Sequence, residues 1–152
     1  PRDVLDNAVP SGGAIAAMAL QRLSVFTGIA EYAEKAETSM KALIPHMEQA
    51  PSAVTSWLAA VDFLRSNSQE VVLIGDESDS VISDMKRELR SSFEPNRVLA
   101  GAVEGSSEPG GSPLLEGRSR VNGKATAYIC ENYACKLPVT STAEMLEQLG
   151  LI

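Results

Sequence analysis

The chain of 152 residues has little of what most often carries chemistry: two cysteines, one histidine and 5% aromatic residues. Two cysteines are too few for the disulfide framework of a small secreted domain, so a reducing cytoplasm is the default expectation. The lone His46 has no cysteine or histidine at zinc-ligand spacing, so no metal site is predicted. The thin aromatic content also argues against a platform on which nucleic-acid bases stack.

Positive charge is also scarce. Thirteen Lys and Arg face 20 Asp and Glu, for a net charge of -7, whereas binding to nucleic acid or to an anionic membrane needs a basic surface. No apolar run approaches the ~18 residues of a membrane helix, and no signal-peptide pattern opens the chain. The sequence therefore predicts a cytoplasmic protein with no nucleic-acid partner, no membrane partner and no cofactor.

Apolar periodicity in residues 1–66 predicts three helices. The first runs from Ser11 to a left-handed stop at Gly28, the second begins near Ala30 and kinks or ends at Pro45, and the third begins at Pro51. The apolar face of the first helix is expected to comprise Ile15, Ala19, Leu23 and Phe26.

In residues 67–152 the spacing of apolar residues is no longer that of helices alone, and it predicts a small α/β region. A helix capped by Ser78 or Asp79 separates the first two strands, which gives a right-handed βαβ unit. Ser141 and Glu144 form the capping box of a last helix. The expected strands cover residues 71–75, 97–102 and 125–130. The fold class is thus α/β: helices, then a three-layer region with a mainly parallel three-stranded sheet and a helix on each face.

Three acids, Asp76, Glu77 and Asp79, follow the first strand in place of a glycine-rich phosphate loop. Acids at a helix N-terminus complement the helix dipole and repel a phosphate. A magnesium site at the strand tip is the alternative, because carboxylates are ligands of hard cations.

The segment before the first helix is a second candidate site. Gly12 and Gly13 can expose backbone N–H groups there, and Asp6 and Asn7 could bind a sugar hydroxyl. The competing interpretation is close helix packing, since glycine lets another element approach.

The two cysteines, Cys130 and Cys135, lie on either side of a short turn, "ENYA", at the end of the third strand. A turn of that size permits the Cα separation of a disulfide. The pair is therefore a buried packing pair, a reversible disulfide or, less readily, half of a metal site. Lys136 should favour the thiolate of Cys135, and Glu131 should disfavour that of Cys130, which makes Cys135 the nucleophile and Cys130 its resolving partner.

Three stretches carry a resemblance to a known family: "DNAVPSGGAIAAMALQRLSVFTG", "VVLIGD" with the downstream "PNRVLAG", and "NGKATAYICENYACKLPV". In this order they resemble the C-terminal end of the spermatogenesis-associated thioredoxin-like proteins, the YyaL-type family. The family pattern usually has Asn where Gly13 stands. The resemblance implies that residues 1–66 are the last helices of an α/α barrel similar to six-hairpin glycosidases, followed by the α/β region, with the thioredoxin-like domain absent.

Three functions remain open from the sequence. The first is a non-catalytic accessory or interaction region. The second is a redox module in which Cys130 and Cys135 exchange electrons with a thioredoxin-like domain, and the third is part of a carbohydrate-active barrel. Apolar residues on several faces of the first helix also predict a homo-oligomer.

Overall fold

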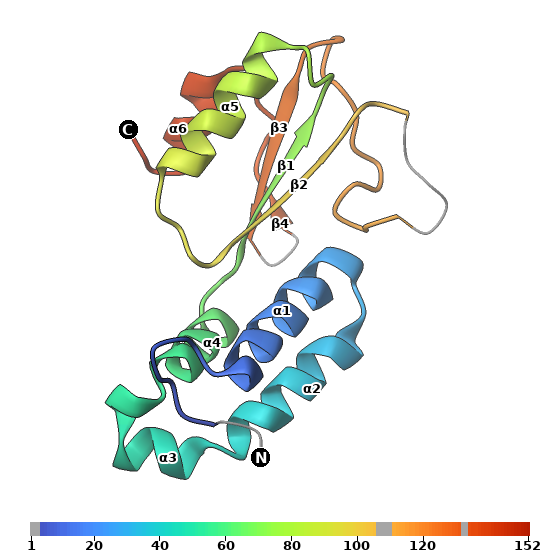
Figure 1. Cartoon of the computed structure of the whole chain (residues 1–152). Coiled ribbons are helices and arrows are strands. Elements are labelled where there is room, and N and C mark those ends of the chain that lie inside the picture. The colour runs from blue at the N-terminus through green and yellow to red at the C-terminus, as the bar shows by residue number, and fades with distance from the viewer. Residues whose placement is uncertain (1–3, 106–110, 132–133) are drawn as a thin grey trace. The chain divides into compact units, whose positions relative to one another are not determined.

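The computed structural model describes residues 4–105, 111–131 and 134–152, and divides the chain into two compact units. One unit ends at Asn67 and the other begins at Ser68. Across the described residues there are six α-helices, one 3-10 helix and a four-stranded sheet, so the protein is a mixed α/β protein (Figure 1). None of the helices in these ranges combines the length and the apolar composition needed to cross a membrane.

The first unit is helical, as the sequence predicts, but it contains four α-helices instead of three. In chain order they are α1 (Gly12–Thr27), α2 (Ala30–Lys41), α3 (Ile44–Gln49) and α4 (Thr55–Arg65), and the 3-10 helix η1 (Pro51–Ala53) lies between the last two. The extra boundary is caused by Pro45, which lies in the first turn of α3 and has no N–H to continue α2. Helix α1 lies beside α2 and packs against both α2 and α4 (Figure 1).

Helix α1 ends where predicted but buries a different face. Gly28 follows it in the left-handed conformation, with φ of 72°. The buried side chains are the small Ala14 and Ala17, together with Gln21, whose amide donates to the carbonyl of Ala60 at 3.0 Å. Small side chains allow the neighbouring helices to approach closely, so they occupy the packed face although they are less apolar. The predicted face is exposed instead: Ile15, Ala19, Leu23 and Phe26.

The second unit holds the sheet, in the order β2-β1-β3-β4. The strands are β1 (Gln69–Ile74), β2 (Arg97–Ala102), β3 (Thr126–Glu131) and β4 (Ala134–Cys135). The predicted βαβ unit is confirmed: β1 and β2 are parallel, and α5 (Ser80–Ser91), capped by Asp79, connects them. The mainly parallel three-stranded sheet is wrong, because β3 pairs antiparallel with β1 and β4 pairs antiparallel with β3. No helix separates β2 from β3 among the described residues, so β3 returns from the end of the sheet at which β2 finishes.

Helices α5 and α6 (Thr142–Gln148) cover the same face of this sheet (Figure 1). The capping box of α6 is confirmed, with Ser141 and Glu144 bonded to each other. Within the described residues of this unit, no helix lies on the opposite face, so the predicted three-layer arrangement is not found in this unit. The core between the sheet and the two helices comprises Val71, Leu73, Ile82, Met85, Leu89, Ala125, Ala127, Ile129, Val139 and Met145.

The opposite face carries the alternate residues of the same strands. Glu70, Val72 and Ile74 of β1 are all buried, although no helix of the described unit covers them. The segment between β2 and β3 supplies part of the cover, because Leu114 is fully buried and Arg118 contacts Cys130 on this face. This loop-covered face is where the cysteine pair lies.

Candidate functional site: a surface disulfide held by an arginine

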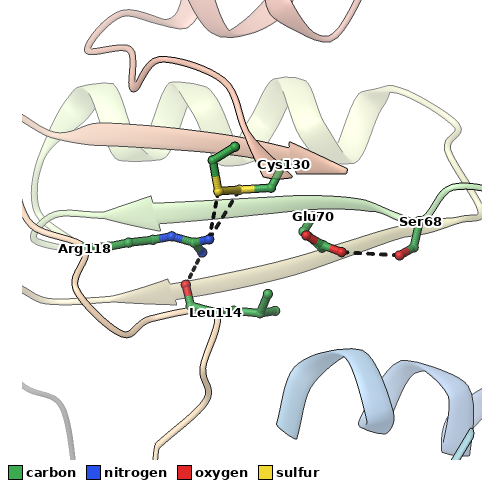
Figure 2. The surroundings of a disulfide bond; sticks show 6 residues. Ser68, Glu70, Leu114, Arg118 and Cys130 are labelled. Atoms are coloured by element: carbon green, nitrogen blue, oxygen red, sulfur yellow. Dashed lines mark hydrogen bonds between the residues drawn. A yellow bond between two sulfur atoms is a disulfide. The ribbon is translucent and has the colours of Figure 1, made fainter. Parts of the chain in front are cut away.

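Cys130 and Cys135 form a disulfide that joins β3 to β4 (Figure 2). The two residues are directly opposite each other in the antiparallel ladder, with their Cα atoms 3.9 Å apart. The prediction that the turn permits a bridge is confirmed. The turn "ENYA" itself includes Asn132 and Tyr133, which lie outside the described residues.

The two halves of the bridge differ in exposure. Cys130 is completely buried, because it lies on the covered face of an inner strand, whereas Cys135 is exposed on the edge strand β4. Cys135 is therefore the half of the bridge that lies at the protein surface. The direction of attack in any exchange reaction follows from this difference.

Arg118 contacts both sulfur atoms. One terminal nitrogen of its guanidinium donates to Cys130 Sγ at 3.3 Å and to Cys135 Sγ at 3.2 Å (Figure 2). A disulfide sulfur is a weak acceptor, but a thiolate is a full negative charge. A guanidinium in this position therefore interacts more favourably with an ionised cysteine sulfur than with a sulfur in a disulfide.

Several contacts fix the guanidinium over the bridge. Its other terminal nitrogen donates to the carbonyl oxygen of Leu114, whose side chain is buried under the sheet. The guanidinium also lies over the ring of Tyr128, 5.5 Å from the centroid. The Tyr128 hydroxyl donates to the carbonyl of Ser119 at 2.7 Å and so holds the residue next to Arg118. The backbone of the loop and the ring of Tyr128 thus hold the positive charge of Arg118 beside the bridge.

Burial lowers the pKa of Arg118, and the charges of Glu70 and Tyr128 oppose that change. An arginine stays protonated despite such a shift, so the guanidinium keeps its positive charge beside the bridge. Glu70 is fully buried and lies directly opposite Cys130 in the pairing of β1 with β3. The bridge is therefore flanked by one fixed cation and one buried carboxylate.

The sequence missed both of these charged residues. Arg118 lies in a loop, and no pattern in the sequence shows that this loop folds over the sheet. The position of Glu70 was predictable, because extending the first strand by one residue places Glu70 on the same face as Val72 and Ile74.

Lys136 does not play the role predicted for it. Lys136 follows the end of β4, and its amine donates to the carbonyl of Gln148 at 2.7 Å. Glu131 follows Cys130 within β3, and because successive strand residues point to opposite faces, its side chain is turned away from Cys130. The charge that acts on the bridge comes from Arg118, which is distant in sequence.

The segment before α1 is occupied by contacts within the protein. Asp6 accepts from the backbone N–H of Ser56 at 2.7 Å and of Ser11 at 2.8 Å, and from the hydroxyl of Thr55 at 3.0 Å. These hydrogen bonds, led by the one from Ser56, lower the pKa of Asp6. Asn7 accepts from the N–H of its neighbour Ala8 at 2.9 Å. Asp6 therefore caps the first turn of α4 from a position about fifty residues away in sequence.

The two glycines at the start of α1 differ. A Cβ at Gly13 would lie 2.7 Å from the Trp57 ring, which shows that this glycine permits close packing, whereas a Cβ at Gly12 would meet nothing within 4 Å. The three acids after β1 also have local partners. Asp76 accepts from Ser78, Asp79 caps α5, and Glu77 lies 3.4 Å from Lys86. Within the described residues, no three His, Cys, Asp or Glu side chains come together as metal ligands.

Together the fold and the site define an α/β protein with a disulfide on the loop-covered face of its sheet. Comparison with known proteins confirms the family resemblance seen in the sequence. The chain is 29% identical over 150 residues to Spermatogenesis-associated protein 20 of Homo sapiens, and equally to that of Mus musculus; each match covers 97% of this chain and 19% of the relative. An uncharacterized protein of Caenorhabditis elegans is 25% identical over 146 residues, or 93% of this chain.

The chain therefore spans about a fifth of the length of the curated relatives it matches. No family model matches the sequence, and no solved structure matches it.

Proposed function

We propose that this chain is an accessory region of a longer protein and that its chemistry is thiol–disulfide exchange at Cys130 and Cys135. The observation that carries the proposal is the contact of Arg118 with both sulfurs, combined with the exposure of Cys135 alone. A cross-link that only joined two strands would need no cation. A centre that alternates between disulfide and dithiol gains from one, because the cation stabilises the thiolates of the open state.

The exchange proceeds in two steps. A thiolate of an external dithiol attacks the exposed sulfur of Cys135, the bridge breaks, and Cys130 leaves as a thiolate next to Arg118. The second thiolate of the reductant then attacks its own partner sulfur in the mixed disulfide and releases Cys135. The reductant becomes a disulfide, and the protein gains two electrons and two protons. The same steps run in reverse when an oxidised partner closes the bridge.

The partner is a protein dithiol. Members of the family that this chain resembles carry a thioredoxin-like domain, so such a domain is the expected partner, in the same polypeptide or in another. The competing function is the non-catalytic accessory role, in which the bridge cross-links β3 to β4 and takes no part in exchange. The two functions differ in what happens to Cys135 when its partner cysteine is removed.

A pair of single-cysteine variants separates these functions. Cys130→Ser leaves Cys135 as a free, exposed thiol next to Arg118, and it should form a mixed disulfide with oxidised glutathione at neutral pH. Cys135→Ser leaves only the buried Cys130, which should not react in the folded state. Intact-mass measurement of the glutathione adducts distinguishes the exchange function from the non-catalytic one. If Cys135 is as inert as Cys130, or if Cys130 is the thiol that reacts, the exchange function is wrong.

A further inference from the structure

Glu70 is a charged residue in an unusual place. It lies near the start of β1, is 0% exposed, and pairs with Cys130 of β3 in the antiparallel register. Directly opposite residues in such a pair have their Cβ atoms about 4.5–5.5 Å apart and point to the same face of the sheet. The Glu70 side chain therefore lies beside the buried half of the bridge, as Figure 2 shows.

A buried carboxylate is costly unless its surroundings compensate the charge. Arg118 supplies the opposite charge, since its guanidinium interacts electrostatically with Glu70. The hydroxyl of Ser68 donates to the carboxylate at 3.4 Å. On the other side of β1, the residue opposite Glu70 is Val98, which cannot ionise. Among the described residues, Arg118 and Tyr128 are thus ionisable groups that lie near Glu70 and the bridge.

In the proposed exchange, the buried Cys130 thiol needs a group with which it can exchange its proton. Its thiol must lose a proton each time the bridge closes and regain one each time it opens, yet it is shielded from solvent. Arg118 cannot accept that proton, because its guanidinium is already protonated. Glu70, on the neighbouring strand, is a suitable acceptor.

We infer that Glu70 is the proton acceptor and donor for Cys130. This inference rests on the proposed exchange function. When the bridge closes, the Cys130 thiol transfers its proton to the Glu70 carboxylate, and its sulfur attacks Cys135 Sγ in the mixed disulfide. The bond from Cys135 to the partner sulfur breaks, the partner leaves as a thiolate, and the proton stays on Glu70. When the bridge opens, Glu70 returns a proton to the departing Cys130 thiolate.

The test isolates the closing step. The reduced protein is treated with 5,5′-dithiobis(2-nitrobenzoate), so that exposed Cys135 carries one nitrothiobenzoate group. Attack by Cys130 then releases a second, coloured nitrothiobenzoate with first-order kinetics, which is followed from pH 5 to 9. Glu70→Gln keeps the size and the hydrogen-bonding capacity of the side chain but cannot accept the proton. We expect release at pH 7 to be about 100-fold slower in Glu70→Gln and to recover as the pH rises, because hydroxide then removes the proton.

The outcomes are separable. If wild-type protein forms the adduct but never releases the second nitrothiobenzoate, the exchange function and this inference both fail. If wild type and Glu70→Gln release it at equal rates with the same pH profile, only the role of Glu70 fails. Glu77→Gln is the matched control, because it makes the same substitution at an exposed residue of the same unit that pairs with Lys86, and it should leave the rate unchanged.

A second measurement covers the case in which Glu70→Gln does not fold. The infrared difference spectrum of the wild-type protein, recorded during closure of the bridge, should show the band of a carboxylic acid as Glu70 takes up the proton. A spectrum without any carboxyl change would overturn the inference.

Discussion

Arg118 lies 3.2 Å from the sulfur of Cys135, the exposed residue of a disulfide whose other residue, Cys130, is buried. The two residues are 17 positions apart in sequence and belong to different elements. Because of this contact, the positive charge of the guanidinium lies next to the cysteine that is exposed at the surface. Most of the chemistry proposed for this chain depends on that contact.

Removing the guanidinium should slow the reaction of Cys135. In a Cys130→Ser background, Arg118→Ala should lower the rate of alkylation of Cys135 by about tenfold at pH 7, because the thiolate loses the cation that stabilises it. The two rates should converge at high pH, where the thiol is ionised in both proteins. The measurement is the rate of iodoacetamide alkylation as a function of pH, followed by mass spectrometry.

Arg120→Ala is the matched control for this variant. Arg120 lies two residues further on and pairs with Glu104 at 3.0 Å, so its removal changes the net charge by the same amount without touching the bridge. It should leave the rate at Cys135 unchanged. Equal slowing in both variants would mean that the overall charge, and not the contact, governs reactivity.

Asp6 should stabilise the helical unit through the first turn of α4. Asp6→Asn should lower the free energy of unfolding by about 1–2 kcal/mol, because two backbone N–H groups lose their charged acceptor. The fluorescence of Trp57, the single tryptophan, reports on this unit during urea unfolding. Asn7→Ala, a change at the next residue, should cost less than about 0.5 kcal/mol.

This stabilisation should depend on pH in one direction. The pKa of Asp6 is lowered below its ordinary value of 3.8, chiefly by the hydrogen bond from Ser56. The carboxylate therefore contributes fully above pH 3.8, and its contribution is lost as the pH falls through the lower value of the folded state. The stability difference between wild type and Asp6→Asn should shrink on acidification. A difference that stays constant down to pH 2 would show that the charge of Asp6 is not involved.

The two glycines of α1 give a direct test of packing against ligand binding. Gly13→Ala places a methyl group 2.7 Å from the ring of Trp57 and should cost about 1–3 kcal/mol. Gly12→Ala meets no atom within 4 Å and should change stability by less than about 0.5 kcal/mol or increase it. Urea unfolding followed by Trp57 fluorescence measures both. Equal effects would argue against the packing interpretation of Gly13.

The exposed apolar face of α1 predicts self-association. Ile15, Leu23 and Phe26 are 46%, 44% and 38% exposed on one side of the helix, and a contiguous apolar patch seldom stays open on a monomer. Light scattering should show a dimer or larger species that Leu23→Glu dissociates. Phe93→Glu is the control, because Phe93 is 92% exposed and belongs to the other unit. A clean monomer at high wild-type concentration would contradict the prediction.

Local patterns in the sequence predict the elements of this protein well. The left-handed stop at Gly28, the cap at Asp79 and the box of Ser141 with Glu144 are all found, because each depends on hydrogen bonds within one turn. The parallel pairing of β1 with β2 was also predictable, since a helix connects them.

Long-range pairing was not predictable in the same way. The antiparallel direction of β3 depends on the route of a loop that has no periodic pattern. The buried face of α1 was misassigned because close packing selected Ala14 and Ala17 over larger apolar residues. Within the candidate site, the cysteine pair was visible in the sequence, but the charges beside it came from a loop residue, Arg118, and from a residue just outside the expected strand, Glu70.

The most direct test of the exchange function is a redox titration of the native protein. The folded wild-type chain is equilibrated in mixtures of reduced and oxidised dithiothreitol, free thiols are trapped by alkylation, and intact mass counts them, while circular dichroism confirms that the protein stays folded. An exchange centre should open and close reversibly, with Cys130 and Cys135 gaining two thiols together at a midpoint above about -300 mV. A bridge that resists reduction until the protein unfolds, or a midpoint well below that value, would show that it serves only to cross-link β3 and β4.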